Sequence, residues 1–268
     1  MDSAANPSFF ATALLWLGAG AGLSVVSYLI YAGIAWLSYG RLVRPVEPDA
    51  DLLLDRFMPN FEVRESHRIR VAAPADVTLA AAGELDLFGL PFVRPIFRAR
   101  EWLLGGEPPK PQRPCGLLAE TRALGWGVLA EAPGREIVVG AVTKPWEANV
   151  IFRAVPAGAF AHFHEPGFVK IIWNLRADPL DAGHCLFRTE TRVVTTDPAA
   201  RARFRRYWAF LSAGIVLIRW LSLRPTRAAA EKMISNFKSQ IPIPCRLRAR
   251  SQQGAPAPHH RIGKCQSS

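Results

Sequence analysis

The clearest pattern along the chain is the alternation of apolar and polar residues between positions 169 and 195. Alternate residues at the start of this stretch are apolar and would share one face of a strand, namely Val169, Ile171, Trp173 and Leu175. A second alternating run covers residues 185–195, and the residues between the two runs are rich in Asp, Pro and Gly. Two strands joined by such a turn predict an antiparallel hairpin.

A long amphipathic helix is predicted directly after this hairpin. Asp197 stands where an N-cap belongs, and Pro198 stands at the first helical position. Apolar residues then recur at spacings of three and four residues, at Phe204, Trp208, Leu211, Ile215, Ile218 and Leu221. Arg219 interrupts the apolar run, which is too short for a second membrane span, so we expect a buried helix.

The rest of the chain predicts further strands and a broken helix before the hairpin. A strand is expected over residues 61–71, and helical segments over 77–87 and 93–104. A proline- and glycine-rich loop follows at residues 105–114, before four more short strands at 117–121, 126–131, 136–143 and 149–153. The order of strand, broken helix, antiparallel strands and long helix predicts the α+β class.

The N-terminal stretch predicts a membrane anchor. No charged residue lies between Asp2 and Arg41, and residues 9–39 are apolar, aromatic or small almost throughout. Roughly 20 such residues cross a bilayer. A cleaved signal peptide is the alternative, but the apolar run is long for one and no basic region precedes it. Arg41 and Arg44 follow the run, so the positive-inside rule predicts a single-pass protein of the cell membrane whose domain faces the cytoplasm.

Four regions are therefore expected: an anchor at residues 1–44, a linker at 45–59, a domain at 60–236 and a basic disordered tail at 237–268. The net charge of +11 lies largely in the tail, where no acidic residue follows Glu231. We expect the tail to attract anionic lipid headgroups and expect no nucleic-acid partner. The four cysteines are widely spaced, which indicates neither a disulfide framework nor a zinc site.

Two segments resemble the START/polyketide-cyclase-like superfamily (SRPBCC), whose members have a helix-grip fold. Residues 69–76 (IRVAAPAD) are similar to the opening strand and first helix of such domains. Residues 193–210 (VVTTDPAARARFRRYWAF) are similar to the passage from their last strand into the closing helix. The resemblance implies a curved antiparallel sheet that grips the C-terminal helix around a cavity for lipids, sterols, polyketides or other apolar molecules. It transfers no catalytic residue to this chain.

The hairpin and the long helix supply the candidate ligand-binding residues. Inward positions combine apolar side chains with hydroxyl groups that could orient a ligand, as pockets for small molecules do. The candidates are Trp173, Phe187, Thr189, Thr191, Trp208, Leu211 and Ile215. The alternative is that the threonines belong to an ordinary core, and the aromatic residues Trp126 and Phe152 are open to the same two interpretations.

Two histidines are the weak catalytic candidates. His67 lies on the apolar face of the first predicted strand, and His164 lies in the segment PAGAFAHFHEPG. The prolines and glycines of that segment favour a solvated loop over a metal or acid–base pair. No motif for a nucleophile, a phosphate loop or a metal is present, and we expect no metal and no cofactor.

These observations predict membrane-anchored binding of a hydrophobic small molecule or lipid in a cavity between the sheet and the C-terminal helix. The alternative is a cyclase- or dehydratase-type enzyme in which a histidine moves a proton within the same cavity. A third possibility is a structural membrane protein whose own side chains fill the space. A cavity of ligand size and a titratable residue inside it would distinguish the three.

Overall fold

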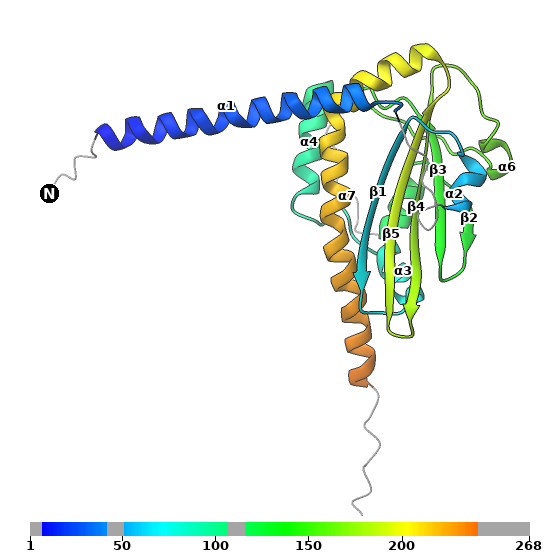
Figure 1. Ribbon diagram of the computed structural model, residues 1–268. Helices are drawn as coiled ribbons and strands as arrows, with labels where there is room; N and C mark the ends of the chain where they lie inside the picture. The colour runs from blue at the N-terminus through cyan, green and yellow to red at the C-terminus, as the bar shows by residue number, and fades with distance from the viewer. Residues whose placement is uncertain (1–6, 42–50, 107–115, 241–268) are drawn as a thin grey trace, which may run out of the picture.

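A five-stranded antiparallel sheet organises the folded part of the chain. The computed structural model describes residues 7–41, 51–106 and 116–240 (Figure 1). The strands lie in the order β1-β5-β4-β3-β2. They are β1 (Val63–Val71), β2 (Gly127–Ala132), β3 (Glu136–Thr143), β4 (Val169–Asp181) and β5 (His184–Thr195).

The helices surround this sheet on both faces. They are α1 (Pro7–Ser38), α2 (Leu52–Phe57), α3 (Ala75–Gly83), α4 (Val93–Leu104), α5 (Leu117–Ala123), α6 (Ala157–Phe160) and α7 (Pro198–Gln240). Helix α7 packs against β1, β5 and α3, whereas α2 contacts β4. Figure 1 shows α7 running along the sheet and α1 projecting away from the domain. The predicted α+β architecture, a curved antiparallel sheet with a long C-terminal helix, is confirmed.

The predicted hairpin is the longest ladder of the sheet. Trp173 of β4 lies opposite Thr191 of β5, and Val169 lies opposite Thr195. Asp197 caps α7 by accepting hydrogen bonds from the amides of Ala199 at 2.8 Å and Ala200 at 2.9 Å. The predicted N-cap and the start of the helix at Pro198 are therefore confirmed.

Two predicted strands are wrong. Residues 117–121 belong to α5, where the Thr121 hydroxyl donates a hydrogen bond to the Leu117 carbonyl at 2.7 Å. A short apolar run fits a helix and a strand equally well, so periodicity could not separate them. Residues 149–153 contribute only one bridge, between Val142 and Arg153. Phe152 packs on Trp126 instead, with ring centroids 4.9 Å apart.

Part of the expected linker belongs to the folded domain. Residues 45–50 lie outside the described residues, but Leu54, Phe57 and Met58 are buried against the outer face of the sheet. Asp51 caps α2 through the amides of Leu53 and Leu54 at 3.1 and 3.0 Å. The expected tail also begins inside α7, which extends to Gln240, and residues 241–268 lie outside the described part.

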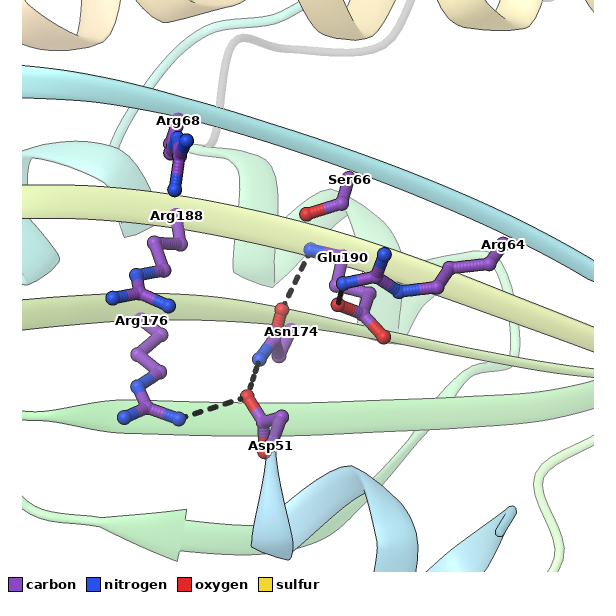
Figure 2. A pocket seen from close by; sticks show the side chains of 8 residues that line it. All are labelled: Asp51, Arg64, Ser66, Arg68, Asn174, Arg176, Arg188 and Glu190. Carbon is purple, nitrogen blue, oxygen red and sulfur yellow. Dashed lines mark hydrogen bonds and ion pairs between the residues drawn. The ribbon is translucent and has the colours of Figure 1, made fainter. Parts of the chain in front are cut away.

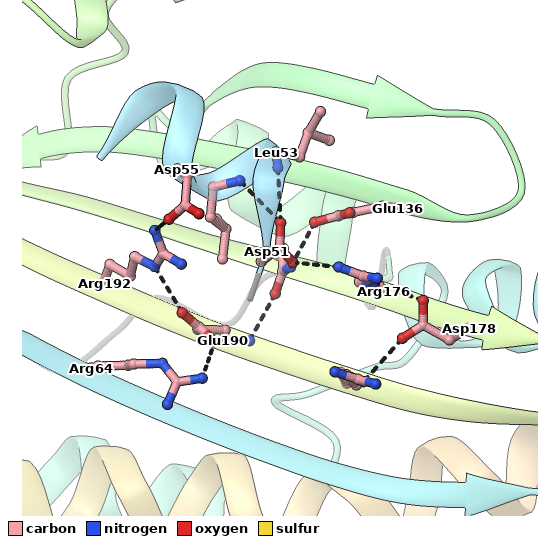
Figure 3. Close-up of polar contacts among 12 residues, drawn as sticks. Asp51, Leu53, Asp55, Arg64, Glu136, Arg176, Asp178, Glu190 and Arg192 are labelled. Atoms are coloured by element: carbon pink, nitrogen blue, oxygen red, sulfur yellow. Dashed lines mark hydrogen bonds and ion pairs between the residues drawn. The ribbon is translucent and has the colours of Figure 1, made fainter. Parts of the chain in front are cut away.

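A polar network joins α2 to the sheet (Figure 3). The Asn174 amide donates hydrogen bonds to Asp51 at 2.8 Å and to Glu136 at 2.7 Å. Its side-chain oxygen accepts from the Glu190 amide at 2.7 Å. Arg192 is fully buried and bridges Asp55 of α2 at 2.5 Å and Glu190 at 2.7 Å. Because buried charges are costly unless they are paired, these contacts fix α2 in one position.

Candidate functional site

The candidate site is a cavity of about 490 Å³ between the sheet, α7 and the segment that carries α4 and α5. Most of its lining is apolar. The side chains that line it from the strands and α7 are Trp173, Leu175, Phe187, Thr189, Ile215, Ile218, Arg219, Ser222, Leu223 and Thr226. The opposite wall includes Leu85, Phe88, Phe97, Arg100, Glu101, Leu117, Glu120, Trp126 and Phe152.

The alternation of side chains along β4 and β5 determines which residues of the sheet line the cavity. Trp173 and Leu175 lie two residues apart on β4, and Phe187 and Thr189 lie two residues apart on β5. Side chains two residues apart share a face of a strand, so all four are directed at α7. Asn174, between the first two, points to the opposite face and joins the network with Asp51.

Aromatic rings form one wall. Trp126 packs on Phe152, and its ring centroid is 6.3 Å from that of Trp173 in an edge-on arrangement. Gly125 precedes Trp126 with a φ of +98°, and a Cβ there would be 2.3 Å from the Phe152 carbonyl oxygen. A glycine is therefore required at this turn for the two aromatic residues to meet. Phe88 and Phe97, with centroids 5.2 Å apart, face the cavity from the α4 side.

Arg219 brings a positive charge into this apolar setting. Its Nη1 donates a hydrogen bond to the Thr189 hydroxyl at 3.2 Å, and its guanidinium lies 5.7 Å from the centre of the Trp173 ring. The Thr189 hydroxyl in turn donates to the Asn174 carbonyl at 2.8 Å. Burial lowers the pKa of Arg219 to about 10, and the nearby Glu65 carboxylate acts in the opposite direction. The guanidinium remains charged at neutral pH and can receive an anionic or carbonyl oxygen.

Glu65 and His67 of β1 lie beside the cavity, on the sheet face that meets α7. Their cross-strand partners in β5 are Thr191 and Thr189, and directly paired residues point to the same side. His67 Nε2 is 3.9 Å from Glu65 Oε2. Burial, followed by the charge of Arg219, lowers the pKa of His67, and burial raises the pKa of Glu65. Neither residue lines the cavity, but both adjoin the Arg219–Thr189 pair.

The structure brings together only part of the predicted site. Trp173, Phe187, Thr189 and Ile215 line the cavity, whereas Thr191, Trp208 and Leu211 are not among its lining residues. Trp208 packs in a separate cluster, with its ring centroid 5.9 Å from that of Phe204. His164 is exposed in the loop after α6, apart from the lining residues. Ligand binding by the predicted set stays a prediction.

Sequence reasoning missed Arg219 as a site residue. It appeared only as the charge that interrupts an apolar run. The signal that could have identified it is its place as an isolated arginine among apolar residues on the inner stripe of a predicted core helix. Charged side chains are rarely buried in such positions unless they have a partner. Among the described residues, no group of three or more His, Cys, Asp or Glu side chains could hold a metal ion.

A second, polar cavity of about 230 Å³ lies on the opposite face of the sheet (Figure 2). Three arginines stand in register across β1, β5 and β4: Arg68 opposite Arg188, and Arg188 opposite Arg176. Asp178 pairs with both Arg176 at 2.8 Å and Arg188 at 2.9 Å. These ion pairs belong to the same layer of contacts that holds α2 on the sheet, which gives this cavity a structural role.

Comparisons with known proteins show no family for this chain. No protein-family model matches the chain, and no curated protein matches it. The structure of Zhui aromatase/cyclase from Streptomyces sp. R1128 is similar at 15% identity and a TM-score of 0.25, covering 64% of this chain and 95% of that one. The di-domain ARO/CYC BexL from the BE-7585A biosynthetic pathway is similar at 15% identity and a TM-score of 0.23, covering 65% of this chain and 46% of that one. The strand order and the helix placement of this chain define its α+β fold.

Proposed function

We propose that this protein is a membrane-anchored binder of a hydrophobic small molecule or lipid, held between the sheet and α7. The observation that carries the proposal is the cavity of about 490 Å³ with its largely apolar lining. Ligand pockets fall between about 300 and 1,000 Å³ and combine apolar walls with a few polar groups. A space of this size argues against the alternative of a structural protein whose own side chains fill the interior.

The polar groups of the cavity favour a ligand with one acidic or carbonyl end. Arg219 and Thr189 are neighbours at 3.2 Å, whereas Trp173, Phe187 and Ile215 offer apolar contact. A guanidinium in an apolar setting binds a carboxylate or phosphate oxygen more strongly than it would in water, because the local dielectric constant is low. We therefore expect an amphipathic ligand whose polar end meets Arg219.

The anchor supplies the membrane part of the proposal. Within the described residues, α1 contains one segment, Leu14–Ser38, that is long and apolar enough to cross a membrane, although a signal sequence would pass the same test. Arg41 follows this helix, and no Lys or Arg precedes it. The positive-inside rule then favours a domain on the cytoplasmic side of the membrane.

Two fluorescent probes with one skeleton test the binding proposal. N-phenyl-1-naphthylamine is neutral, and 1-anilinonaphthalene-8-sulfonate adds a sulfonate. We expect both to bind the full chain in nanodiscs, and Ile215→Trp, which places an indole ring where the ligand would lie, to abolish the protein-dependent signal. Leu180→Trp places the same side chain on an exposed position of the β4–β5 hairpin and is the matched control. Equal signals from the two variants would contradict binding in the cavity.

A second function, acid–base catalysis, is favoured by one specific observation. Glu65 and His67 share the sheet face of Thr189 and have oppositely shifted pKa values, as paired acids and bases in enzymes do. A cyclase or dehydratase would require one of them to move a proton on a bound apolar substrate. If the protein is such an enzyme, His67→Ala should abolish turnover and leave probe binding intact. If it is a passive binder, the unmodified protein should show no turnover.

A further inference from the structure

The last three turns of α1 pack on α7 rather than projecting freely. Tyr28, Tyr31, Ala32, Ala35 and Tyr39 recur at spacings of three and four residues, which places them on one stripe of the helix. Ala32 and Tyr39 are buried, and Tyr31 is half-buried. This stripe makes the end of α1 part of the domain surface.

Polar contacts fix the two helices to each other. The Tyr28 hydroxyl donates a hydrogen bond to the Phe210 carbonyl, and the Tyr31 hydroxyl lies 3.0 Å from that of Ser212. Arg205 donates to the Trp36 carbonyl at 2.8 Å, and its guanidinium lies 4.2 Å from the centre of the Trp36 ring. Phe210 is therefore level with Tyr28 along α1.

The part of α1 beyond this joint has the length of one bilayer core. From residue 14 to residue 27, every described side chain is exposed. The end of the apolar segment Leu14–Ser38, from Tyr28 onward, is joined to α7, so residues 7–27 are the part of α1 free of the domain. At about 1.5 Å per residue these residues span about 31 Å, against about 30 Å for the hydrocarbon core. A membrane crossed by α1 would thus end near Tyr28, and Phe210 would lie at its surface.

Helix α4 lies on the side of the domain that carries Phe210 and the projecting part of α1 (Figure 1). A Cβ on Gly214 would be 2.7 Å from Ile96 Cγ2, so α4 crosses α7 about one turn from Phe210. Figure 1 shows α4 beside α7 on the side toward which α1 projects. The inner face of α4 lines the cavity with Phe97, Arg100 and Glu101.

The outer face of α4 has the composition of a membrane interface. Arg94, Arg98 and Trp102 follow one another at intervals of four residues and are exposed, with Trp102 at 83% of its surface. Leu103 is exposed beside it. On α7, the exposed side chains include Phe210, Leu217 and Trp220. Tryptophan is enriched at the headgroup level of bilayers, and arginine is attracted to anionic lipids.

We propose that α4 and the segment of α7 from Phe210 to Trp220 lie on the bilayer surface. Trp102 enters the interface, and Arg94 and Arg98 contact anionic headgroups. Helix α4 then lies between the cavity and the membrane, because its inner face lines the cavity and its outer face meets the lipid headgroups. This inference rests on the proposed membrane anchor α1. The test below distinguishes a failure of the anchor from a failure of the docking of α4 and α7.

Spin labels at three positions of the full chain provide the test. Gly18→Cys reports on α1, Trp102→Cys on α4, and Leu180→Cys on the β4–β5 hairpin at the far end of the sheet (Figure 1). The labels are placed in a background with Cys115, Cys245 and Cys265 changed to serine, and the buried Cys185 is retained. The chain is reconstituted in nanodiscs of phosphatidylcholine and phosphatidylglycerol. Electron paramagnetic resonance then compares accessibility to oxygen, which partitions into lipid, with accessibility to a water-soluble nickel complex.

We expect labels 18 and 102 to show lipid-like accessibility and label 180 to show aqueous accessibility. Label 18 in lipid with label 102 in water would overturn the docking and leave the anchor in place. Label 18 in water would show that α1 does not span the membrane and would overturn both. The double change Arg94→Glu and Arg98→Glu should move label 102 toward water in these discs, and an unchanged signal would overturn the headgroup contact.

Discussion

Arg219 and Thr189 are joined by a hydrogen bond of 3.2 Å that connects the C-terminal helix to the centre of the sheet inside the apolar cavity. The Thr189 hydroxyl donates its hydrogen to the Asn174 carbonyl. Toward the Arg219 guanidinium the hydroxyl oxygen is therefore the acceptor. Arginine carries five N–H donors, and Arg219 lines the cavity, so a ligand there can reach donors that Thr189 does not use. The pair therefore defines the end of the cavity at which a ligand oxygen would bind.

Replacing Arg219 should change which ligands bind more than how stably the protein folds. Arg219→Met keeps an unbranched apolar chain but removes the guanidinium, so the sulfonated probe should lose at least about tenfold in affinity, equivalent to about 1.4 kcal/mol. The neutral probe should bind as before. Because burial disfavours the charge, as the lowered pKa of Arg219 indicates, the melting temperature should not fall. Titration of both probes and a thermal melt check this, and equal loss of both probes would contradict the assigned role.

Thr189→Val removes the hydroxyl while preserving the shape of the side chain. The Asn174 carbonyl and one arginine donor lose their partner, which should cost about 1 kcal/mol of unfolding free energy. Affinity for the sulfonated probe should fall modestly. Chemical denaturation measures the stability. His164→Ala, on the exposed loop after α6, is the control, and neither property should change. A loss of binding as large as that of Arg219→Met would mean that Thr189 is itself the main anchor.

Stability should depend on pH through Glu136. Burial, together with the neighbouring Asp51 carboxylate, raises the pKa of Glu136 to about 7, against an ordinary value of 4.5. The folded protein therefore holds the proton more tightly than the unfolded chain, so this group's contribution is most favourable at low pH and is lost as pH rises from about 4.5 to about 7.

Glu136→Gln tests this dependence because its amide oxygen can still accept from Asn174. Its melting temperature should exceed that of the unmodified protein at pH 8, by an amount equivalent to roughly 1–3 kcal/mol, and should match it near pH 4. A difference that does not vary with pH would show that folding does not shift the pKa of Glu136.

Asp51→Ala should release α2 from the sheet. The substitution removes the N-cap of α2 and the acceptor for Asn174 and Arg176 at once. The loss of a cap costs about 1 kcal/mol, and the one Asn174 N–H that loses its acceptor adds about 1–3 kcal/mol. Hydrogen exchange should increase over residues 52–57. Protection there that matches the unmodified protein would mean that apolar burial of Leu54 and Phe57 is sufficient.

The sheet, the hairpin and the long helix could be predicted because their patterns are long. Residues 169–195 alternate over enough positions to fix both the strands and the face that meets α7. Helix α2 escaped prediction because LLLDRF is too short to show a period, and its position depends on Asp51, Asn174 and Arg192, which lie far apart in sequence.

The cavity could be predicted only on its sheet side. Trp173, Phe187 and Thr189 follow from strand alternation, but the opposite wall is built by α4, α5 and the segment with Phe152, whose positions depend on long-range packing. Trp208 follows the same helical period as Ile215, yet it lies two turns earlier and packs on Phe204 beside Tyr39 of the N-terminal segment. A period identifies the inner face of α7 but does not show which part of that face meets the cavity.

Native mass spectrometry of the full chain released from its membrane tests the central claim most directly. A hydrophobic ligand in the cavity predicts a fraction of molecules carrying the additional mass of one small molecule, which should disappear in Ile215→Trp and persist in Leu180→Trp. The same adduct in both variants would place the ligand outside the cavity. Only the bare mass in all three proteins, together with no binding of the neutral naphthylamine probe, would contradict the account.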